Sequence, residues 1–196
     1  MAQGVILAGG FSSRANTNKM LLTIDNKPLI VLTINGMKPY VDKIIVVTGH
    51  YDKEIREILK DEQVTILFNK DYESGMFSSI LTVIKEIDDD FFIIPGDIPF
   101  VKGVTYESLL KGKKEIRIPV YKGKQGHPLF IKKELLRELK NEPICSNLKA
   151  FRDRHDKEEI NVDDKNILID IDTIEQYKKI IEERKEWYEL KSKLLL

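Results

Sequence analysis

The sequence has little of several residue types, and each scarcity excludes a class of protein. Cys145 is the only cysteine among 196 residues, so no disulfide forms within this sequence and a cysteine-based zinc site is not expected. No stretch approaches the roughly 18 consecutive apolar residues that a membrane-spanning helix needs. The N-terminal segment MAQGVILAGG lacks the basic region and the long apolar run of a signal peptide. We therefore expect a cytoplasmic protein without a membrane segment.

An excess of one charge sign is also absent. Lys and Arg total 32, as do Asp and Glu. General nucleic-acid binders usually carry a basic surplus, so we expect no nucleic-acid partner. Hydrophobic residues make up 42% and charged residues 33% of the chain, which suits a sizeable core with a solvated surface. Because no repeat or Pro/Gly/Ser-rich linker interrupts the sequence, we treat residues 1–196 as one domain.

Short apolar runs alternate with amphipathic stretches through the first half of the chain. The runs are rich in β-branched and aromatic residues, and they predict buried strands at residues 4–7, 43–48, 64–68 and 91–95. The stretches between them predict helices at residues 28–37, 52–60 and 76–87. This alternation implies a doubly wound, Rossmann-like α/β fold with a mostly parallel sheet.

The second half of the chain has a looser pattern. Residues 116–121 and 128–131 flank the turn-forming segment KGKQGH and predict a hairpin-like insertion. A further strand is predicted within residues 161–172, followed by a charged amphipathic helix at residues 173–193. The apolar residues of this helix predict a face that docks on the domain: Tyr177, Ile180, Ile181 and Trp187.

A glycine-rich loop follows the first predicted strand directly. In open parallel sheets, ligands bind beyond the carboxyl ends of the strands, where this loop lies. Gly9 and Gly10 have no side chains, so their N–H groups can approach a phosphate closely. The spacing is neither that of a Walker A loop nor that of a dinucleotide fingerprint, and Gly-Gly alone more often marks a simple turn at the end of a strand. The loop continues with two hydroxyl donors and two positive charges suited to a polyphosphate: Ser12, Ser13, Arg14 and Lys19.

Two acidic segments are candidates for a metal site. Asp97 lies in the rigid turn PGDIP, directly after the predicted strand at residues 91–95. Magnesium prefers oxygen ligands and usually bridges one or two carboxylates to substrate phosphates. Asp170 and Asp172 offer a second carboxylate, and on a strand their side chains would point to the same side. The residues alone favour helix capping over metal binding for Asp172, and Thr173 is an equal candidate for the cap.

Two further segments contain polar candidates. GMFSS begins the predicted helix at residues 76–87, and a hydroxyl-rich helix N-terminus suits a polar ligand, although a simple cap by Ser74 explains it equally well. His127 stands in GHP, and because no nucleophilic triad is visible we treat it as a positioning residue. His50 and His155 are expected at the surface or at helix ends, and three scattered histidines do not make a zinc site.

These segments, in this order, resemble the MobA-like nucleotidyltransferases, which include the molybdenum-cofactor cytidylyl- and guanylyltransferases. L-A-G-G-x-S-S-R-x-x-x-x-K-x-L is similar to the opening motif of that family, and GMFSS, GDIP, GHP and DIDT follow it. The resemblance implies the nucleotidyltransferase (GT-A-like) version of the predicted fold. It also implies a Mg²⁺-dependent transfer of a nucleotide from a nucleoside triphosphate to a phosphate-bearing acceptor, with pyrophosphate released. Molybdopterin would be the acceptor, and a molybdoenzyme apoprotein would be a partner.

The resemblance assigns roles to the residues that match its motifs. Those implied to bind the nucleotide are Leu7, Ala8, Gly9, Gly10, Ser12, Ser13, Gly75 and Ser79. Those implied to be catalytic are Arg14, Lys19 and Asp97. The implied metal ligands are Asp97 and Asp172, and His127 is placed on the acceptor side.

Departures from the family pattern leave the substrates open. Ala15-Asn16 stands where family members usually have Met-Gly, and DIDTIEQ lacks the Pro and the second acid of the family's closing motif. LAGG is typical of the guanylyl members, whereas GMFSS, GHP and DIDT are similar to the cytidylyl members, so CTP is only slightly preferred over GTP. The main alternative enzyme uses a sugar-phosphate or alditol-phosphate acceptor. The alternative from another class is a non-catalytic nucleotide-binding accessory protein for molybdoenzyme maturation.

Overall fold

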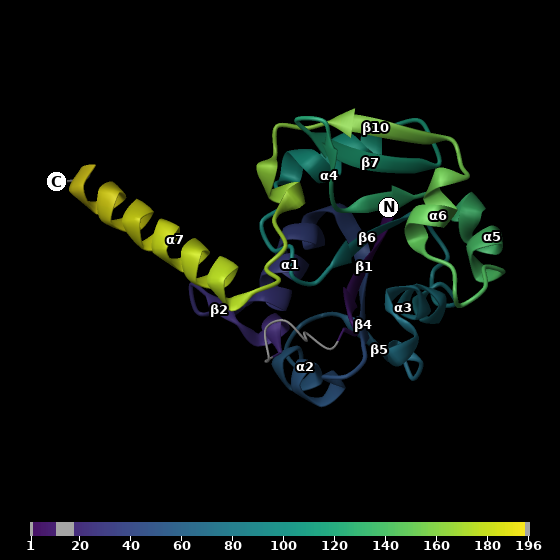
Figure 1. Cartoon of the computed structure of the whole chain (residues 1–196), viewed down its shortest axis with the longest axis horizontal. Coiled ribbons are helices and arrows are strands. Elements are labelled where there is room, and N and C mark those ends of the chain that lie inside the picture. Colours follow the sequence, from purple (N-terminus) through teal and green to yellow (C-terminus); the bar gives the residue numbers. More distant parts are fainter. Residues whose placement is uncertain (1, 11–17, 195–196) are drawn as a thin grey trace.

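A mixed sheet forms the centre of the molecule (Figure 1). The computed structural model describes residues 2–10 and 18–194, with the side chains of the last helix described up to residue 185. The strands lie in the order β10-β7-β9-β6-β1-β4-β5, and the short strand β8 pairs with β7. They are β1 (Ala2–Ala8), β4 (Val41–Thr48), β5 (Thr65–Phe68), β6 (Phe91–Pro95), β7 (Ile116–Tyr121), β8 (Lys124–Gln125), β9 (Leu129–Ile131) and β10 (Lys157–Asn161). A separate antiparallel ribbon consists of β2 (Thr23–Ile24) and β3 (Lys27–Pro28).

Helices cover both faces of the sheet, and short 3₁₀ turns connect several elements (Figure 1). The α-helices are α1 (Leu29–Met37), α2 (Asp52–Ile58), α3 (Met76–Val83), α4 (Gly103–Lys111), α5 (Leu136–Lys140), α6 (Leu148–Asp153) and α7 (Ile174–Leu194). The 3₁₀ turns are η1 (Lys19–Leu21), η2 (Lys38–Tyr40), η3 (Tyr72–Ser74), η4 (Lys133–Leu135) and η5 (Lys165–Leu168). Among the described residues, no helix is both long enough and apolar enough to cross a membrane.

Successive residues of β1 face opposite sides of the sheet, because side chains alternate along a strand. Val5 and Leu7 pack in the hydrophobic cluster with α3, α5 and α6. Ile6 and Ala8 pack with α1, α2 and α4 on the other face. β1 is buried along its whole length because β4 and β6 flank it in parallel and helices cover both faces. This arrangement confirms the predicted doubly wound, mostly parallel α/β fold.

Two predictions for the second half of the chain need correction. Residues 116–121 and 128–131 do pair antiparallel, as β7 and β9, but they are not an insertion, because β9 lies inside the main sheet and also pairs with β6. The strand predicted within residues 161–172 ends where that range begins, since β10 spans Lys157–Asn161. β10 is an edge strand, so its polar sequence KEEIN hides it from a search for apolar runs.

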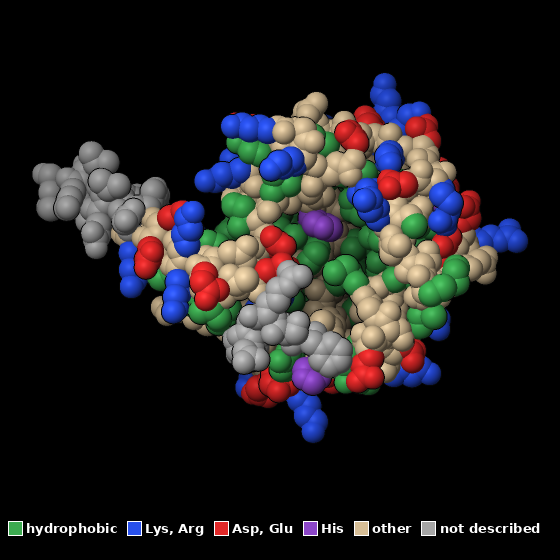
Figure 2. Space-filling model, in the orientation of Figure 1, with side chains coloured by type: hydrophobic (Ala, Val, Ile, Leu, Met, Phe, Trp, Pro, Cys, Tyr) green, Lys and Arg blue, Asp and Glu red, His purple; other side chains and the backbone are tan. Residues whose placement is uncertain are grey.

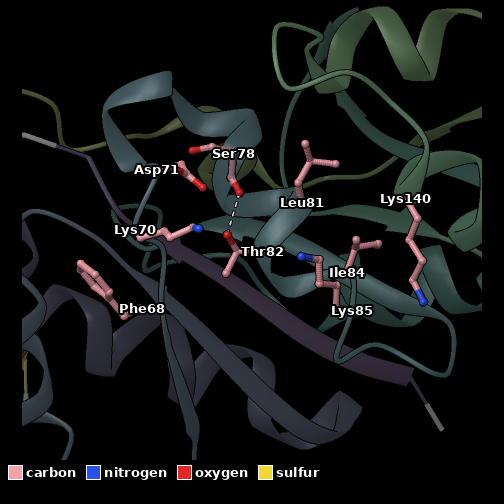
Figure 3. Close-up of a pocket in the computed structure, with 9 residues that line it drawn as sticks. All are labelled: Phe68, Lys70, Asp71, Ser78, Leu81, Thr82, Ile84, Lys85 and Lys140. Carbon is pink, nitrogen blue, oxygen red and sulfur yellow. Dashed lines mark hydrogen bonds between the residues drawn. The ribbon is translucent and has the colours of Figure 1, made fainter.

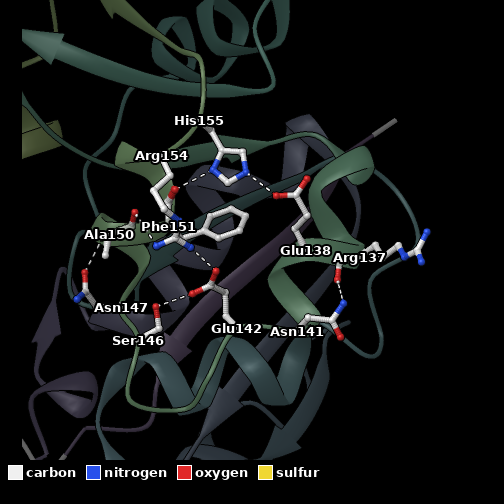
Figure 4. Close-up of polar contacts among 10 residues, drawn as sticks. All are labelled: Arg137, Glu138, Asn141, Glu142, Ser146, Asn147, Ala150, Phe151, Arg154 and His155. Carbon is white, nitrogen blue, oxygen red and sulfur yellow. Dashed lines mark hydrogen bonds and ion pairs between the residues drawn. The ribbon is translucent and has the colours of Figure 1, made fainter.

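Polar contacts join α5 to α6 on the face of the sheet that α3 also covers (Figure 4). The imidazole of His155 lies 2.9 Å from a carboxylate oxygen of Glu138 on α5 and 2.8 Å from the carbonyl oxygen of Phe151 on α6. Glu142 accepts hydrogen bonds from Arg154 and from Ser146. His155 therefore has the helix-terminal position that was expected, and its contacts hold two short helices together.

The last helix begins against the domain and then extends away from it (Figure 1). Tyr177, Ile180 and Ile181 pack beside the buried residues Leu29 and Ile171, as predicted for a docking face. The hydroxyl of Tyr177 also donates a 2.6 Å hydrogen bond to a backbone carbonyl of β2. The side chain of Trp187, the fourth predicted member of this face, lies outside the described residues.

Candidate active site

Three loops meet at one edge of the sheet because β1, β4 and β6 are parallel neighbours. The loop after β1 begins at Gly9, the loop after β4 at Gly49 and the loop after β6 at Gly96. Gly96 donates a backbone hydrogen bond to the carbonyl of Leu7, and any side chain on Gly49 would collide with the backbone of Gly9. The loop after β4 therefore supports the first loop, and residues of the loops after β1 and β6 line the clefts at this edge. Three predicted site residues of the first loop, Ser12, Ser13 and Arg14, lie outside the described residues.

The first cleft at this edge has a volume of about 290 Å³. Predicted nucleotide-binding residues that line it are Leu7, Gly9, Gly10, Gly75 and Ser79, together with Tyr72, Glu73 and Met76. The side chain of Ala8, also predicted to bind the nucleotide, instead packs in the core. The cleft therefore joins the first loop to the start of α3.

Gly75 is the residue that allows α3 to begin in this cleft. Its φ angle of +95° is one that residues with a side chain rarely adopt, so glycine is required there. Gly75 occupies the N-cap position, and the hydroxyl of Ser78 donates a 2.7 Å hydrogen bond to its carbonyl. The simple reading of Ser74 as the helix cap was therefore wrong.

Ser79 is held in place by Asn69, which sequence reasoning missed. The side chain of Asn69 is fully buried, and its amide nitrogen donates to the hydroxyl oxygens of Ser78 at 2.7 Å and Ser79 at 3.0 Å. Its carbonyl oxygen accepts from the hydroxyl of Thr82 and the backbone N–H of Asp71. Because Asn69 follows β5 directly, a polar residue at the carboxyl end of a predicted strand was the available signal.

The second cleft adjoins the first, since Met76 lines both. It has a volume of about 370 Å³. Four predicted site residues line it, namely Lys19, Asp97, His127 and Asp172, together with Asp170. The face of the molecule in Figure 2 is hollowed near its centre, where acidic and histidine side chains lie among hydrophobic ones.

The ammonium of Lys19 bridges two carboxylates in this cleft. It forms ion pairs with Asp97, which is almost fully buried, and with Asp172 at 2.5 Å. Burial alone would lower the pKa of Lys19, but hydrogen bonds and charge from Asp172 and Asp97 together raise it. Burial also raises the pKa of Asp170, as do the neighbouring charges of Asp172 and Asp97. Three carboxylates and one ammonium therefore share one small volume.

Asp172 lines the cleft, and another residue caps α7. The hydroxyl oxygen of Thr173 accepts from the backbone N–H of Gln176 at 3.2 Å, and the Gln176 side chain accepts from the N–H of Thr173 at 2.9 Å. This reciprocal pair is a capping box. Helix capping by Asp172, which the residues alone favoured, was therefore wrong. A hydrogen bond from the N–H of Ile171 to the carbonyl of Asp97 ties the two acidic loops together.

The carboxylates fit a divalent metal ion that also binds substrate oxygens. Oδ1 of Asp97 is buried and has no hydrogen-bond partner within the described residues, so it can accept a further ligand. The described chain holds no cluster of three or more His, Cys, Asp or Glu side chains that would bind a metal alone. Magnesium suits a site with so few protein ligands, because it is usually held by one or two carboxylates and by phosphates of the substrate.

His127 lies in the same cleft in a neutral form. Burial lowers the pKa of its imidazole to about 4, although the charge of Asp97 acts in the opposite direction. Its Nδ1 atom is buried and has no hydrogen-bond partner in the part of the chain that the structure describes. His127 therefore lines the cleft without adding positive charge, and its buried Nδ1 is left unsatisfied.

Known proteins similar to this chain were found by sequence and by structure. The molybdenum cofactor cytidylyltransferase of Escherichia coli K12 is 25% identical over 176 residues, which cover 88% of this chain and 92% of that protein. The probable molybdenum cofactor guanylyltransferase of Natranaerobius thermophilus is 29% identical over 165 residues, covering 76% and 78%. Rv0371c of Mycobacterium tuberculosis H37Rv has the same fold, with a TM-score of 0.81 at 23% identity over 92% of this chain and 97% of that one. A structure of Rv0371c in complex with manganese gives a TM-score of 0.75 at 20% identity, over 92% and 98%.

The family assignment rests on the sequence profile described as the MobA-like NTP transferase domain. This profile matches residues 4–159, which include the first loop, α3, Asp97 and His127. The acidic pair at positions 170 and 172 lies beyond the match. The resemblance seen in the sequence motifs is confirmed, and the non-catalytic alternative is set aside. The chain belongs to the MobA-like NTP transferase family and is a nucleotidyltransferase.

Proposed function

We propose that this chain transfers a nucleotide from CTP, in slight preference to GTP, to the terminal phosphate of molybdopterin. Pyrophosphate is the second product, and Mg²⁺ is the cofactor. One observation carries the proposal: the glycine-lined cleft and the carboxylate-lined cleft are adjacent and share Met76. A triphosphate in the first cleft would therefore place its phosphates beside Asp97 and Lys19.

The first cleft would hold the nucleoside triphosphate. Backbone N–H groups of Gly9 and Gly10 would donate to phosphate oxygens, because neither residue has a side chain to keep a phosphate away. Ser79 lies against Gly9, and Asn69 already donates to its hydroxyl oxygen. The Ser79 hydroxyl is therefore left to donate its own hydrogen to the nucleotide.

The second cleft would hold the charge of the reacting phosphates. Asp97 and Asp172 would bind Mg²⁺, which when bound neutralises negative charge on the triphosphate. Lys19 now pairs with the same two carboxylates. When these carboxylates bind the metal, the Lys19 ammonium would instead donate to phosphate oxygens. Arg14 would add a second positive charge from the first loop. Positioning and electrostatic stabilisation are sufficient for such a transfer, so no covalent nucleophile is needed.

His127 would orient the acceptor. A neutral imidazole with an unpaired Nδ1 forms a hydrogen bond without contributing charge, which suits a residue that positions an acceptor phosphate already close to Lys19.

Pyrophosphate release tests this proposal. The enzyme is incubated with Mg²⁺, molybdopterin and each of the four nucleoside triphosphates, and alditol phosphates and sugar phosphates replace molybdopterin in parallel reactions. We expect release that requires molybdopterin and is fastest with CTP. Release with a sugar or alditol phosphate but not with molybdopterin would overturn the acceptor, and faster release from GTP would overturn the base.

A further inference from the structure

A separate cavity of about 550 Å³ lies along a different face of α3 from the nucleotide cleft (Figure 3). Ser78, Leu81, Thr82 and Lys85 line it, and their spacing of three and four residues places them on one face of the helix and its C-terminal extension. Ser79, which lines the nucleotide cleft, is offset from that face by one residue. The two cavities are therefore separated by the helix itself.

Three exposed lysines from different elements line this cavity. Lys70 follows β5, Lys85 follows α3 and Lys140 ends α5. Lys70 and Lys85 extend their amino groups towards each other beside Thr82 (Figure 3). Within the described chain, none of the three forms an ion pair or a side-chain hydrogen bond. The one acidic residue lining the cavity is Asp71, so the lining carries a surplus of positive charge.

The wall between these lysines is rigid and partly apolar. Thr82 donates to the carbonyl oxygens of Ser78 and of the Asn69 side chain, so its hydroxyl is already satisfied. The apolar part of the wall includes Ile84, which is buried, and Phe68, a residue that is 48% exposed. A ligand would therefore meet fixed hydroxyl groups, an aromatic ring and unpaired ammonium groups.

We propose that this cavity is a second ligand site, which binds a small phosphate-bearing molecule with a planar or apolar body. The phosphate would lie between the amino groups of Lys70 and Lys85 and accept charge-assisted hydrogen bonds from both. The body of the ligand would lie against Phe68, the exposed apolar residue of the lining. The volume lies within the roughly 300–1,000 Å³ of pockets that bind small molecules. The site is distinct from the transferase clefts, because it shares no lining residue with either of them.

Pyridoxal 5′-phosphate is a suitable probe, because it combines a phosphate, a planar ring and an aldehyde. The aldehyde condenses with a neutral lysine amine to an imine and water, and borohydride then reduces the imine to a stable amine. At equimolar reagent, peptide mapping by mass spectrometry should find several-fold more label on Lys70 and Lys85 than on Lys53, an exposed lysine of α2. Phenyl phosphate, which cannot form an imine, should protect Lys70 and Lys85. Label spread evenly over the exposed lysines, without protection, would overturn the proposal.

Direct binding gives an independent measurement. Titration calorimetry with phenyl phosphate should show binding weakened by about tenfold or more in the double variant Lys70→Gln/Lys85→Gln, because charge-assisted hydrogen bonds are lost. The double variant Lys53→Gln/Lys111→Gln removes the same charge from exposed positions outside the cavity and should bind like the parent protein. Equal affinity in both double variants would overturn the proposal. Circular dichroism of the variants reports whether the fold is unchanged.

Discussion

The two oxygens of the Asp97 carboxylate have different surroundings. Oδ2 pairs with the ammonium of Lys19, whereas Oδ1 is buried without a hydrogen-bond partner among the described residues. An amide at this position would keep the shape but lose the charge. We therefore expect Asp97→Asn to lower Mg²⁺-dependent turnover by about 10²-fold or more, while Lys19 keeps its contact with Asp172. Steady-state kinetics and the melting temperature measure the two effects.

A matched control for this variant is Asp61→Asn, which removes a carboxylate from an exposed position after α2. It should leave turnover unchanged. Turnover near the parent value in Asp97→Asn, with the fold intact, would refute the metal assignment. Comparison of Asp170→Asn with Asp172→Asn then identifies the second ligand, and we expect the larger loss of turnover at Asp172.

Asn69 does not line the first cleft, but it holds Ser79, a proposed nucleotide contact. The side-chain amide of Asn69 donates hydrogen bonds to Ser79, which lines the first cleft, and to Ser78, which does not. The two serines therefore allow a comparison within one hydrogen-bond network. We expect Asn69→Ala to raise the KM for the nucleoside triphosphate several-fold with a smaller change in kcat. It should also lower the free energy of unfolding by about 2 kcal/mol, because buried partners lose their hydrogen bonds. Ser78→Ala should leave KM unchanged. An equal rise in KM for Ser78→Ala would mean that the effect is a general loosening of α3.

The low pKa of His127 makes stability depend on pH. Burial places this pKa at about 4 in the folded state, below the ordinary value of about 6.5 in the unfolded chain. As pH falls from 6.5 towards 4, the unfolded state binds a proton that the folded state does not, so stability is lost in that window. The loss is up to about 3 kcal/mol. Urea unfolding at stepped pH should show a shallower loss for His127→Gln than for the parent protein, and parallel curves would contradict the assignment.

At the scale of elements, the capping box of α7 links helix stability to the site. Thr173 and Gln176 cap each other, and the Gln176 side chain also accepts from the backbone N–H of Asp172. Thr173→Ala should lower the free energy of unfolding by about 1 kcal/mol and raise the Mg²⁺ concentration needed for half-maximal turnover. Thr173→Ser retains the hydroxyl and should behave like the parent. If the serine variant is as impaired as the alanine variant, the cap does not explain the effect.

The elements predicted well are buried ones, because burial requires a recognisable pattern of apolar residues in the sequence. β1, β4 and β6 are covered on both faces, so apolar runs mark them clearly. β10 is an edge strand with polar residues, and α5 and α6 have five and six residues, too few to show helical periodicity. These elements were missed for that reason.

Site residues were predictable where a motif within a single loop marks them. Lys19, Asp97 and Asp172 were proposed individually, and the structure brings them into one cleft although 153 positions separate the first from the last. The capping of α7 by Thr173 and the role of Asn69 depend on tertiary contacts, and local sequence did not distinguish Asp172 from Thr173 as the cap.

At the scale of the whole molecule, the clefts are lined by the loops that follow five strands, β1, β5, β6, β8 and β10, and the last loop leads to α7. A ligand that fills both clefts should therefore stabilise the entire fold. By mass action, a ligand present at about 100 times its Kd stabilises the folded state by about 2.7 kcal/mol. For a chain of this size, this corresponds to a rise in Tm of roughly 5–10 °C. We expect that rise with CTP and Mg²⁺ together, and a smaller one with CTP alone, because the carboxylates of Asp97 and Asp172 would face the phosphates without a metal between them.

The variant Asp97→Asn separates this explanation from binding of the base alone. It should retain the smaller shift with CTP and lose the additional shift that Mg²⁺ gives, since one metal ligand is missing. Differential scanning calorimetry of both proteins, with and without Mg²⁺, measures all four values. An additional Mg²⁺ shift that persists in Asp97→Asn would place the metal elsewhere. An additional Mg²⁺ shift that requires both CTP and Asp97 would indicate that the two clefts bind one complex of metal and nucleotide.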